Sequence, residues 1–184
     1  MDSRIVVMGV SGCGKTTLGE ALAARIGATF IDGDSLHSRE NVAKMTRGEP
    51  LTDKDRWPWL ETIGQRLGAS VGPMVIASSA LRRRYRERIT AAAGEPVLFI
   101  HLAGDIDLIG SRMRAREDHY MPPSLLRSQF DALEPPDPDE DAFSVSIDGS
   151  PDDVLADTLR MLEARDGPRR DRAPDRGKAP VSGA

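Results

Sequence analysis

An eight-residue stretch near the start of the chain, GVSGCGKT at residues 9–16, matches the whole G-x-x-x-x-G-K-[ST] pattern of a phosphate-binding loop. The apolar run IVVM at residues 5–8 precedes it and an amphipathic stretch follows, which predicts a buried strand, this loop and a helix in succession. In such a loop the glycines let backbone N–H groups converge on one anion, and the helix adds its positive N-terminal end. We therefore expect a nucleotide phosphate site at this position.

The predicted nucleotide-binding residues belong to this loop, with one arginine from further along the chain. Lys15 would place its charge on the β- and γ-phosphates and so also acts in catalysis, while the Thr16 hydroxyl is a predicted Mg²⁺ ligand. Cys13 is oxidisable if the helix N-terminus lowers its pKa, but we assign its side chain no catalytic role. The full nucleotide-binding set is Gly9, Ser11, Gly12, Cys13, Gly14, Lys15, Thr16, Thr17 and Arg112.

Short apolar runs alternate with amphipathic stretches along the chain. The expected strands lie at residues 5–8, 29–31, 74–77, 97–102 and 143–147. The expected helices lie at residues 15–26, 39–45, 53–67, 81–89 and 106–113, with one more after Ser150. This alternation predicts an α/β fold with a parallel sheet, helices on both faces, and ligands at the carboxyl ends of the strands.

The 184 residues suit one domain, which we place at residues 1–165. Residues 166–184 are rich in Gly, Pro and Arg and predict a disordered basic tail. The single cysteine excludes a disulfide framework and fits a cytoplasmic protein. No apolar run approaches the roughly 18 residues of a membrane span. A net charge of −4 argues against nucleic-acid binding, although the tail leaves a nucleotide-responsive nucleic-acid-binding protein as an alternative.

Two aspartates follow the second expected strand in the sequence DGD at residues 32–34. If that strand neighbours the first, one carboxylate can hold a metal-bound water while the other orients or deprotonates an attacking hydroxyl group. We expect Asp34 to be the base and Asp32 to bind magnesium, although the sequence leaves the reverse open. Gly33 would leave room for the acceptor. A plain turn is the alternative.

The next stretch, at residues 33–60, reads GDSLHSRENVAKMTRGEPLTDKDRWPWL. It resembles the gluconokinase family of small phosphate-loop kinases, whose pattern is G-D-x-L-H-P-x-x-N-x-x-K-M-x-x-G-x-P-L-x-D-x-D-R-x-P-W-L. Ser38 departs from it, since the family usually has proline there. The blocks SALRRRYR, from residue 79, and RMRAREDHYM, from residue 112 and leading to SQF at 128–130, also agree. The resemblance covers about residues 4–163.

The resemblance implies ATP-dependent phosphorylation of D-gluconate at its 6-hydroxyl group, which gives 6-phospho-D-gluconate and ADP with Mg²⁺ as cofactor. It implies the five-stranded fold of shikimate and nucleoside monophosphate kinases, in a homodimer. The acceptor-binding segment would span about residues 34–70 and a mobile lid about residues 115–130. A related kinase with shikimate or a nucleoside monophosphate as acceptor is the alternative.

Gluconate carries a carboxylate and a row of hydroxyl groups, so its site should hold arginine and hydrogen-bonding side chains. The predicted acceptor-binding residues are Asp34, His37, Lys44, Arg56, Arg82 and His119. Arg116 shares a helix face with Arg112 and is predicted to be catalytic, because an arginine there stabilises the transferring phosphoryl group. The alternative for Arg56 is a surface salt bridge. The other arginines at residues 82–88 and the acidic connector at 134–141 are expected to be solvated.

Overall fold

The computed structural model describes residues 3–114 and 123–166. At its centre is a five-stranded parallel sheet in the order β2-β3-β1-β4-β5. The strands are β1 (Arg4–Met8), β2 (Thr29–Asp32), β3 (Met74–Ala77), β4 (Leu98–Ala103) and β5 (Ala142–Ser146). The predicted fold class is confirmed, and every expected strand lies within one residue of its predicted bounds.

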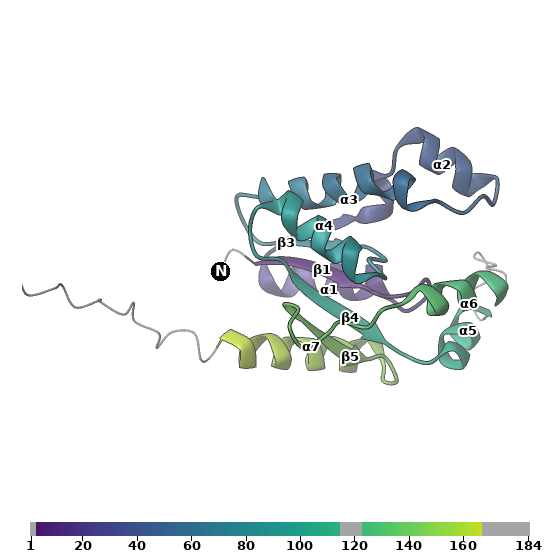
Figure 1. Cartoon of the computed structure of the whole chain (residues 1–184). Coiled ribbons are helices and arrows are strands. Elements are labelled where there is room, and N and C mark those ends of the chain that lie inside the picture. The colour runs from purple at the N-terminus through teal and green to yellow at the C-terminus, as the bar shows by residue number, and fades with distance from the viewer. Residues whose placement is uncertain (1–2, 115–122, 167–184) are drawn as a thin grey trace, which may run out of the picture.

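Helices cover both faces of this sheet (Figure 1). Helices α3 (Asp53–Gly68) and α4 (Arg83–Ala93) pack on one face, and α1 (Lys15–Ile26) and α7 (Pro151–Asp166) pack on the other. Strand β1 contributes side chains to the cores on both faces of the sheet. Val6 and Met8 lie in the core under α3 and α4, and Ile5 and Val7 lie in the opposite core. A strand buried on both faces is typical of parallel sheets and explains its unbroken apolar run.

Shorter helical elements gather at the carboxyl ends of the strands (Figure 1). They are η1 (Gly33–Leu36), α2 (Arg39–Thr46), α5 (Ile106–Arg114) and α6 (Pro123–Ala132). Of the lid predicted at residues 115–130, the part at 115–122 lies outside the described residues, and the rest belongs to α6. The predicted tail begins one residue too early, because α7 includes Asp166, and residues 167–184 lie outside the described part.

An ion pair is buried between α4 and the connector that precedes β5. The Arg86 side chain is 1% exposed and that of Glu140 is 9% exposed, with nitrogen–oxygen distances of 2.6 and 2.7 Å. Arg86 Nη1 also donates to the carbonyl oxygens of Ala80, Leu81 and Glu134. The expectation of a solvated position is therefore wrong for Arg86 and for Glu140. Arg86 lies three residues before buried Ile89, which puts it on the inner side of the helix.

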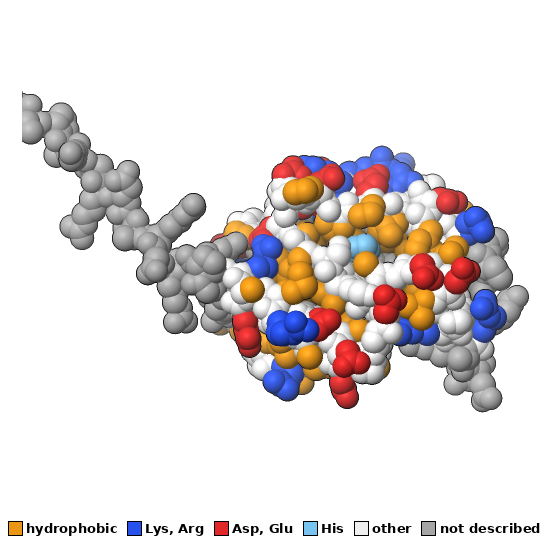
Figure 2. All heavy atoms as spheres, turned by 90° about the horizontal axis from the view of Figure 1, so that it is seen from below, with side chains coloured by type: hydrophobic (Ala, Val, Ile, Leu, Met, Phe, Trp, Pro, Cys, Tyr) orange, Lys and Arg blue, Asp and Glu red, His pale blue; other side chains and the backbone are white. Residues whose placement is uncertain are grey.

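Figure 2 shows the face that is turned downward in Figure 1. Acidic and basic side chains of the described residues are interspersed among apolar ones there. No helix in the part of the chain that the structure describes is long and apolar enough to cross a membrane.

Two histidines are expected to make the fold sensitive to acid: His37, which is half-buried, and His101, which is buried. Burial lowers the pKa of His37 and that of His101, which is 5% exposed on β4 beside Ser144. Arg86 lowers the pKa of His101 further. Because the folded pKa lies below about 6.5, the unfolded chain binds more protons as the pH falls through that value. We expect the free energy of unfolding, measured with urea, to fall between pH 7 and pH 5, and to fall less in His101→Gln. If the free energy of unfolding of His101→Gln falls with pH as steeply as that of the wild type, His101 does not cause the acid sensitivity.

Candidate active site

The phosphate loop joins β1 to α1 at the carboxyl end of the sheet. Gly12 and Gly14 have φ values of +80° and +100°, in the left-handed region that favours glycine, and Gly14 is the N-cap of α1. A side chain at Gly12 would also meet the Met113 side chain of α5 at 2.5 Å. Left-handed residues at alternate positions allow successive N–H groups to converge on an anion. The conformation fits the predicted phosphate site.

Cys13 lies inside this loop with only 3% of its surface exposed. Burial is the largest influence on its thiol and raises the pKa, although the charge of Lys15 acts in the opposite direction. A thiol kept protonated and covered is a poor nucleophile. The alternative of an oxidisable Cys13 is therefore not supported, and the side chain serves as packing.

Two side chains hold the peptide group that links Val10 to Ser11. Lys15 Nζ donates to the carbonyl oxygen of Val10 at 3.0 Å. Gln129 Oε1, from α6, accepts the N–H of Ser11 at 2.6 Å. Gln129 was not among the predicted site residues. Its only sequence signal is its place in the block at residues 128–130, since a hydrogen bond to a backbone N–H leaves no pattern of its own.

Asp32 and Asp34 occupy different environments at the end of β2. Thr16 Oγ1 donates to Asp32 Oδ2 at 3.3 Å, and Asp32 Oδ1 accepts the N–H of Asp34 at 3.0 Å. The Asp34 carboxylate is exposed, and it has no hydrogen-bond or ion-pair partner within residues 3–114 and 123–166. The assumption that β2 neighbours β1 is wrong, because β3 lies between them. Asp32 reaches the phosphate site through Thr16, at the start of α1.

Gly33 is needed for packing, and the expectation that it makes room for the acceptor is wrong. It is buried, and a Cβ atom there would lie 2.4 Å from the carbonyl oxygen of Ala77. Trp59 of α3 fixes the same turn, because its Nε1 donates to the carbonyl oxygen of Gly33 at 2.7 Å. The His37 ring stacks on the Trp59 ring, with their centroids 4.1 Å apart and their planes at 15°. These contacts fix the backbone that carries Asp34.

Asp34 and Arg56 both lie within electrostatic reach of His37. Burial has the largest effect on the pKa of His37 and lowers it. The charge of Asp34 raises this pKa, and the charge of Arg56 lowers it. Arg56 Nη1 donates to the carbonyl oxygen of Leu51, and its guanidinium carbon lies 5.8 Å from the centroid of the Tyr85 ring. It forms no ion pair with a described residue, so the surface salt bridge is wrong for Arg56. The structure thus places two predicted acceptor residues, Asp34 and Arg56, near a third, His37.

Lys44 of α2 forms an ion pair with Asp55, in the first turn of α3. Its Nζ lies 2.8 Å from Asp55 Oδ1, and Asp55 also closes the capping box with Thr52 at the start of α3. These bonds keep the pKa of the Asp55 carboxyl well below its usual range. Lys44 therefore connects α2 to α3, and acceptor contact by its ammonium group stays a prediction.

Of the remaining predicted residues, the structure describes Arg112 on α5 and Arg82 at the start of α4. Arg112 Nη2 donates to the carbonyl oxygen of Gly149 at 3.1 Å, in the loop before α7. Arg82 is half-buried at the N-cap of α4, and its side chain makes no hydrogen bond to a described residue. Arg116 and His119 lie outside the described residues.

The oxygen atoms of Thr16 and Asp32 fit a magnesium ion. Mg²⁺ prefers hard oxygen ligands and is held by one or two protein groups together with phosphates and water. The described part of the chain has no cluster of three or more His, Cys, Asp or Glu residues that could hold a metal alone. A magnesium ion here would therefore arrive with the nucleotide.

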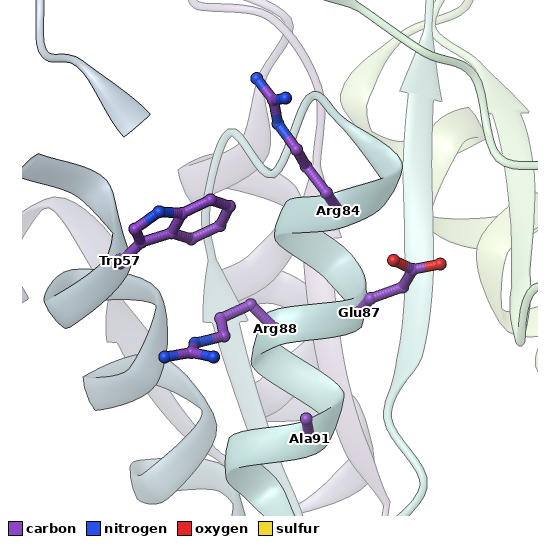
Figure 3. Close-up of a pocket in the computed structure, with 5 residues that line it drawn as sticks. All are labelled: Trp57, Arg84, Glu87, Arg88 and Ala91. Atoms are coloured by element: carbon purple, nitrogen blue, oxygen red, sulfur yellow. The ribbon is translucent and has the colours of Figure 1, made fainter. Parts of the chain in front are cut away.

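A separate open groove of about 360 Å³ lies between α3 and α4 (Figure 3). Its lining consists of Trp57, Arg84, Glu87, Arg88 and Ala91. Both arginines are ion-paired, Arg84 with Asp53 and Arg88 with Glu61. None of the lining residues belongs to the predicted site, so we place the active site at the phosphate loop and not in this groove.

Comparisons with known proteins agree with this geometry. Residues 5–136 match a family model described as an AAA domain. A gluconokinase from Gluconobacter oxydans is 43% identical over 166 residues, which cover 88% of this chain and 92% of that protein. The crystal structure of a gluconokinase from Sinorhizobium meliloti superposes with a TM-score of 0.83 at 42% identity, covering 89% of this chain and 93% of that one.

A more distant structure shares the fold alone. The shikimate kinase from Bacteroides thetaiotaomicron superposes with a TM-score of 0.62 at 18% identity, over 88% of this chain and 98% of that one. The acidic strand end expected of large ATPase motors is missing here, because β3 leads into Ser78 and Ser79. The AAA-domain match thus describes the phosphate-loop core.

Proposed function

Because the chain belongs to the gluconokinase family of phosphate-loop kinases, we propose that it transfers the terminal phosphoryl group of ATP to the 6-hydroxyl group of D-gluconate. The products are 6-phospho-D-gluconate and ADP. The observation that supports this most is its similarity to gluconokinases over nearly their whole length. The five-stranded core with an intact phosphate loop is common to kinases of several acceptors and would not distinguish them alone.

The two aspartates divide the work at the end of β2. Asp34 orients the 6-hydroxyl group and accepts its proton, a role that its exposed, unpaired carboxylate supports. Asp32 is engaged with Thr16, which suits a residue that holds magnesium. Bound Mg²⁺ neutralises charge on the phosphate oxygens during the transfer.

Cationic side chains stabilise the transferring group. Lys15 Nζ is bonded to the carbonyl oxygen of Val10, five residues earlier in the same loop, and from this place its ammonium group acts on the β- and γ-phosphates. Arg112 binds the nucleotide from α5, and Arg116 stabilises the equatorial oxygens of the phosphoryl group. The role of Arg116 stays a prediction from its spacing to Arg112, because it lies outside the described residues.

The acceptor is recognised by side chains from η1 and α3. Arg56 binds the gluconate carboxylate, because its guanidinium group is free of any ion pair with a described residue. His37 is held neutral by its lowered pKa and can hydrogen-bond a hydroxyl group. Contacts from Lys44, Arg82 and His119 complete the proposed acceptor site.

ATP consumption with Mg²⁺ against a panel of acceptors tests this function. The panel holds D-gluconate, other aldonates, shikimate, glucose and a nucleoside monophosphate. We expect strong turnover on D-gluconate alone, and a Lys15→Ala control should abolish it, because the phosphates then lose their main cationic partner. Faster turnover on another acceptor would identify a related kinase instead.

The homodimer and the cytoplasmic location stay predictions. Sedimentation equilibrium would test whether the protein is a dimer.

A further inference from the structure

The peptide group between Val10 and Ser11 is gripped at both of its polar atoms. Its carbonyl oxygen accepts a hydrogen bond from Lys15 Nζ, and its N–H donates one to Gln129 Oε1. The C=O and N–H of a trans peptide point in opposite directions, so the two side chains hold this unit from opposite sides. Lys15 comes from the loop itself, whereas Gln129 lies 118 residues after Ser11 in the chain.

The chemistry of the contact fixes the orientation of the Gln129 carboxamide. A backbone N–H can only donate, so the atom that faces Ser11 must be the carboxamide oxygen. The distance of 2.6 Å lies just below the usual range of about 2.7–3.2 Å for such bonds, so the two groups are in close contact. An acceptor on the N–H also polarises the carbonyl group of the same peptide, which strengthens its bond to the Lys15 ammonium group.

Gln129 is presented by a firmly anchored helix. Leu126 of α6 is 5% exposed, and Phe130 packs against the same core, which includes Ile109 of α5. Just after α6, the N–H of Glu134 donates to the carbonyl oxygen of Leu81 at 2.8 Å. The buried Arg86 holds the carbonyl oxygen of Glu134 in turn.

The anchoring leads back to the phosphate loop. The loop after β3 receives the bond from Glu134, and its Ser79 carbonyl oxygen accepts the N–H of Gly9 at 3.3 Å. The phosphate loop is therefore tied to one connected framework at Gly9 and again at Ser11. Helix α5 also packs against the phosphate loop, because its Met113 side chain lies next to Gly12.

We propose that Gln129 is a positioning residue for phosphoryl transfer. It holds the Val10–Ser11 peptide so that the carbonyl group keeps the Lys15 ammonium group at a set place beside the phosphates. Gln129 touches no substrate in this role and acts through Lys15. The proposal rests on the proposed kinase function for its relevance to catalysis, but it makes no assumption about the acceptor.

The variant Gln129→Met removes the acceptor atom and keeps an unbranched side chain of similar length. We expect the Kd values of ATP and ADP, measured by calorimetry without gluconate, to rise about tenfold, the effect of one lost hydrogen bond. The Kd of AMP should stay within about twofold, because Lys15 acts on the β- and γ-phosphates. Gln65→Met, the same change at an exposed position on α3, is the matched control and should change neither affinity nor Tm.

A double-mutant cycle with Lys15→Met separates positioning from packing. If Gln129 acts through Lys15, Gln129→Met should cause no further loss of ATP affinity in the Lys15→Met background. An additive loss, or an equal loss of AMP affinity, would overturn the proposal. Tighter ATP binding by Gln129→Met would also overturn it, since Gln129 would then compete with phosphate for the Ser11 amide. Lack of turnover on gluconate would refute the proposed function and leave these binding results unaffected.

Discussion

Replacing Asp34 with asparagine is expected to lower kcat for gluconate phosphorylation about 10²- to 10⁴-fold, the range that a positioned general base contributes. The amide keeps the size of the side chain but cannot accept the proton of the 6-hydroxyl group. The Kd of ATP should stay close to that of the wild type, because no contact joins Asp34 to a phosphate-loop side chain within the described residues. Steady-state kinetics and calorimetry provide the two measurements.

Asp32→Asn is the matched control for this experiment. Asp32 contacts Thr16, so its loss should raise the Mg²⁺ concentration needed for half-maximal activity. Asp34→Asn should leave that concentration nearly unchanged. Normal kcat in Asp34→Asn, together with a severe loss in Asp32→Asn, would reverse the two roles.

Replacing Arg86 with methionine is expected to lower the free energy of unfolding by about 3–5 kcal/mol, the cost of breaking a buried ion pair from one side. The Glu140 carboxylate, whose pKa Arg86 now lowers, would be left in the interior without a cation. The carbonyl oxygens of Ala80, Leu81 and Glu134 would lose the same partner. Urea denaturation at neutral pH measures the effect.

Arg88→Met, two residues after Arg86 and on the outer side of α4, is the control. The Arg88–Glu61 pair is largely exposed, and such pairs contribute about 0–1 kcal/mol. The double variant Arg86→Met with Glu140→Met should be more stable than Arg86→Met alone, since the uncompensated charge is gone. Similar losses in Arg86→Met and Arg88→Met would show that burial does not govern these pairs.

The sequence predicted the sheet well because β1 to β4 each contain a short apolar run between polar loops, while β5 alternates apolar residues with serines. The spatial order of the strands was harder, since apolar runs carry no record of which neighbours they pair with. Asp32 was expected beside the phosphate loop because β2 was assumed to neighbour β1. It does lie beside the loop, but β3 separates the two strands. Thr16 supplies the contact that strand adjacency was expected to give.

Long-range polar contacts explain the other differences. Arg86 stands among five arginines at residues 82–88 that together look like a solvated face, and its burial depends on Glu140, 54 residues away. Lys44 and Arg56 are both basic residues of one motif, yet only Lys44 has a carboxylate partner in the described structure. Periodicity does not distinguish such cases, because the partners belong to separate elements.

The contact between Trp59 and His37 gives the protein a natural optical reporter. The chain has two tryptophans, and both lie on α3: Trp57 lines the groove against α4, whereas Trp59 contacts the turn at Gly33. Trp59 is bonded to Gly33 and stacked on His37, so its emission depends on the turn that carries Asp34. Ultraviolet fluorescence of the unlabelled protein therefore observes the acceptor side of the site, with Trp57→Phe leaving Trp59 as the single emitter.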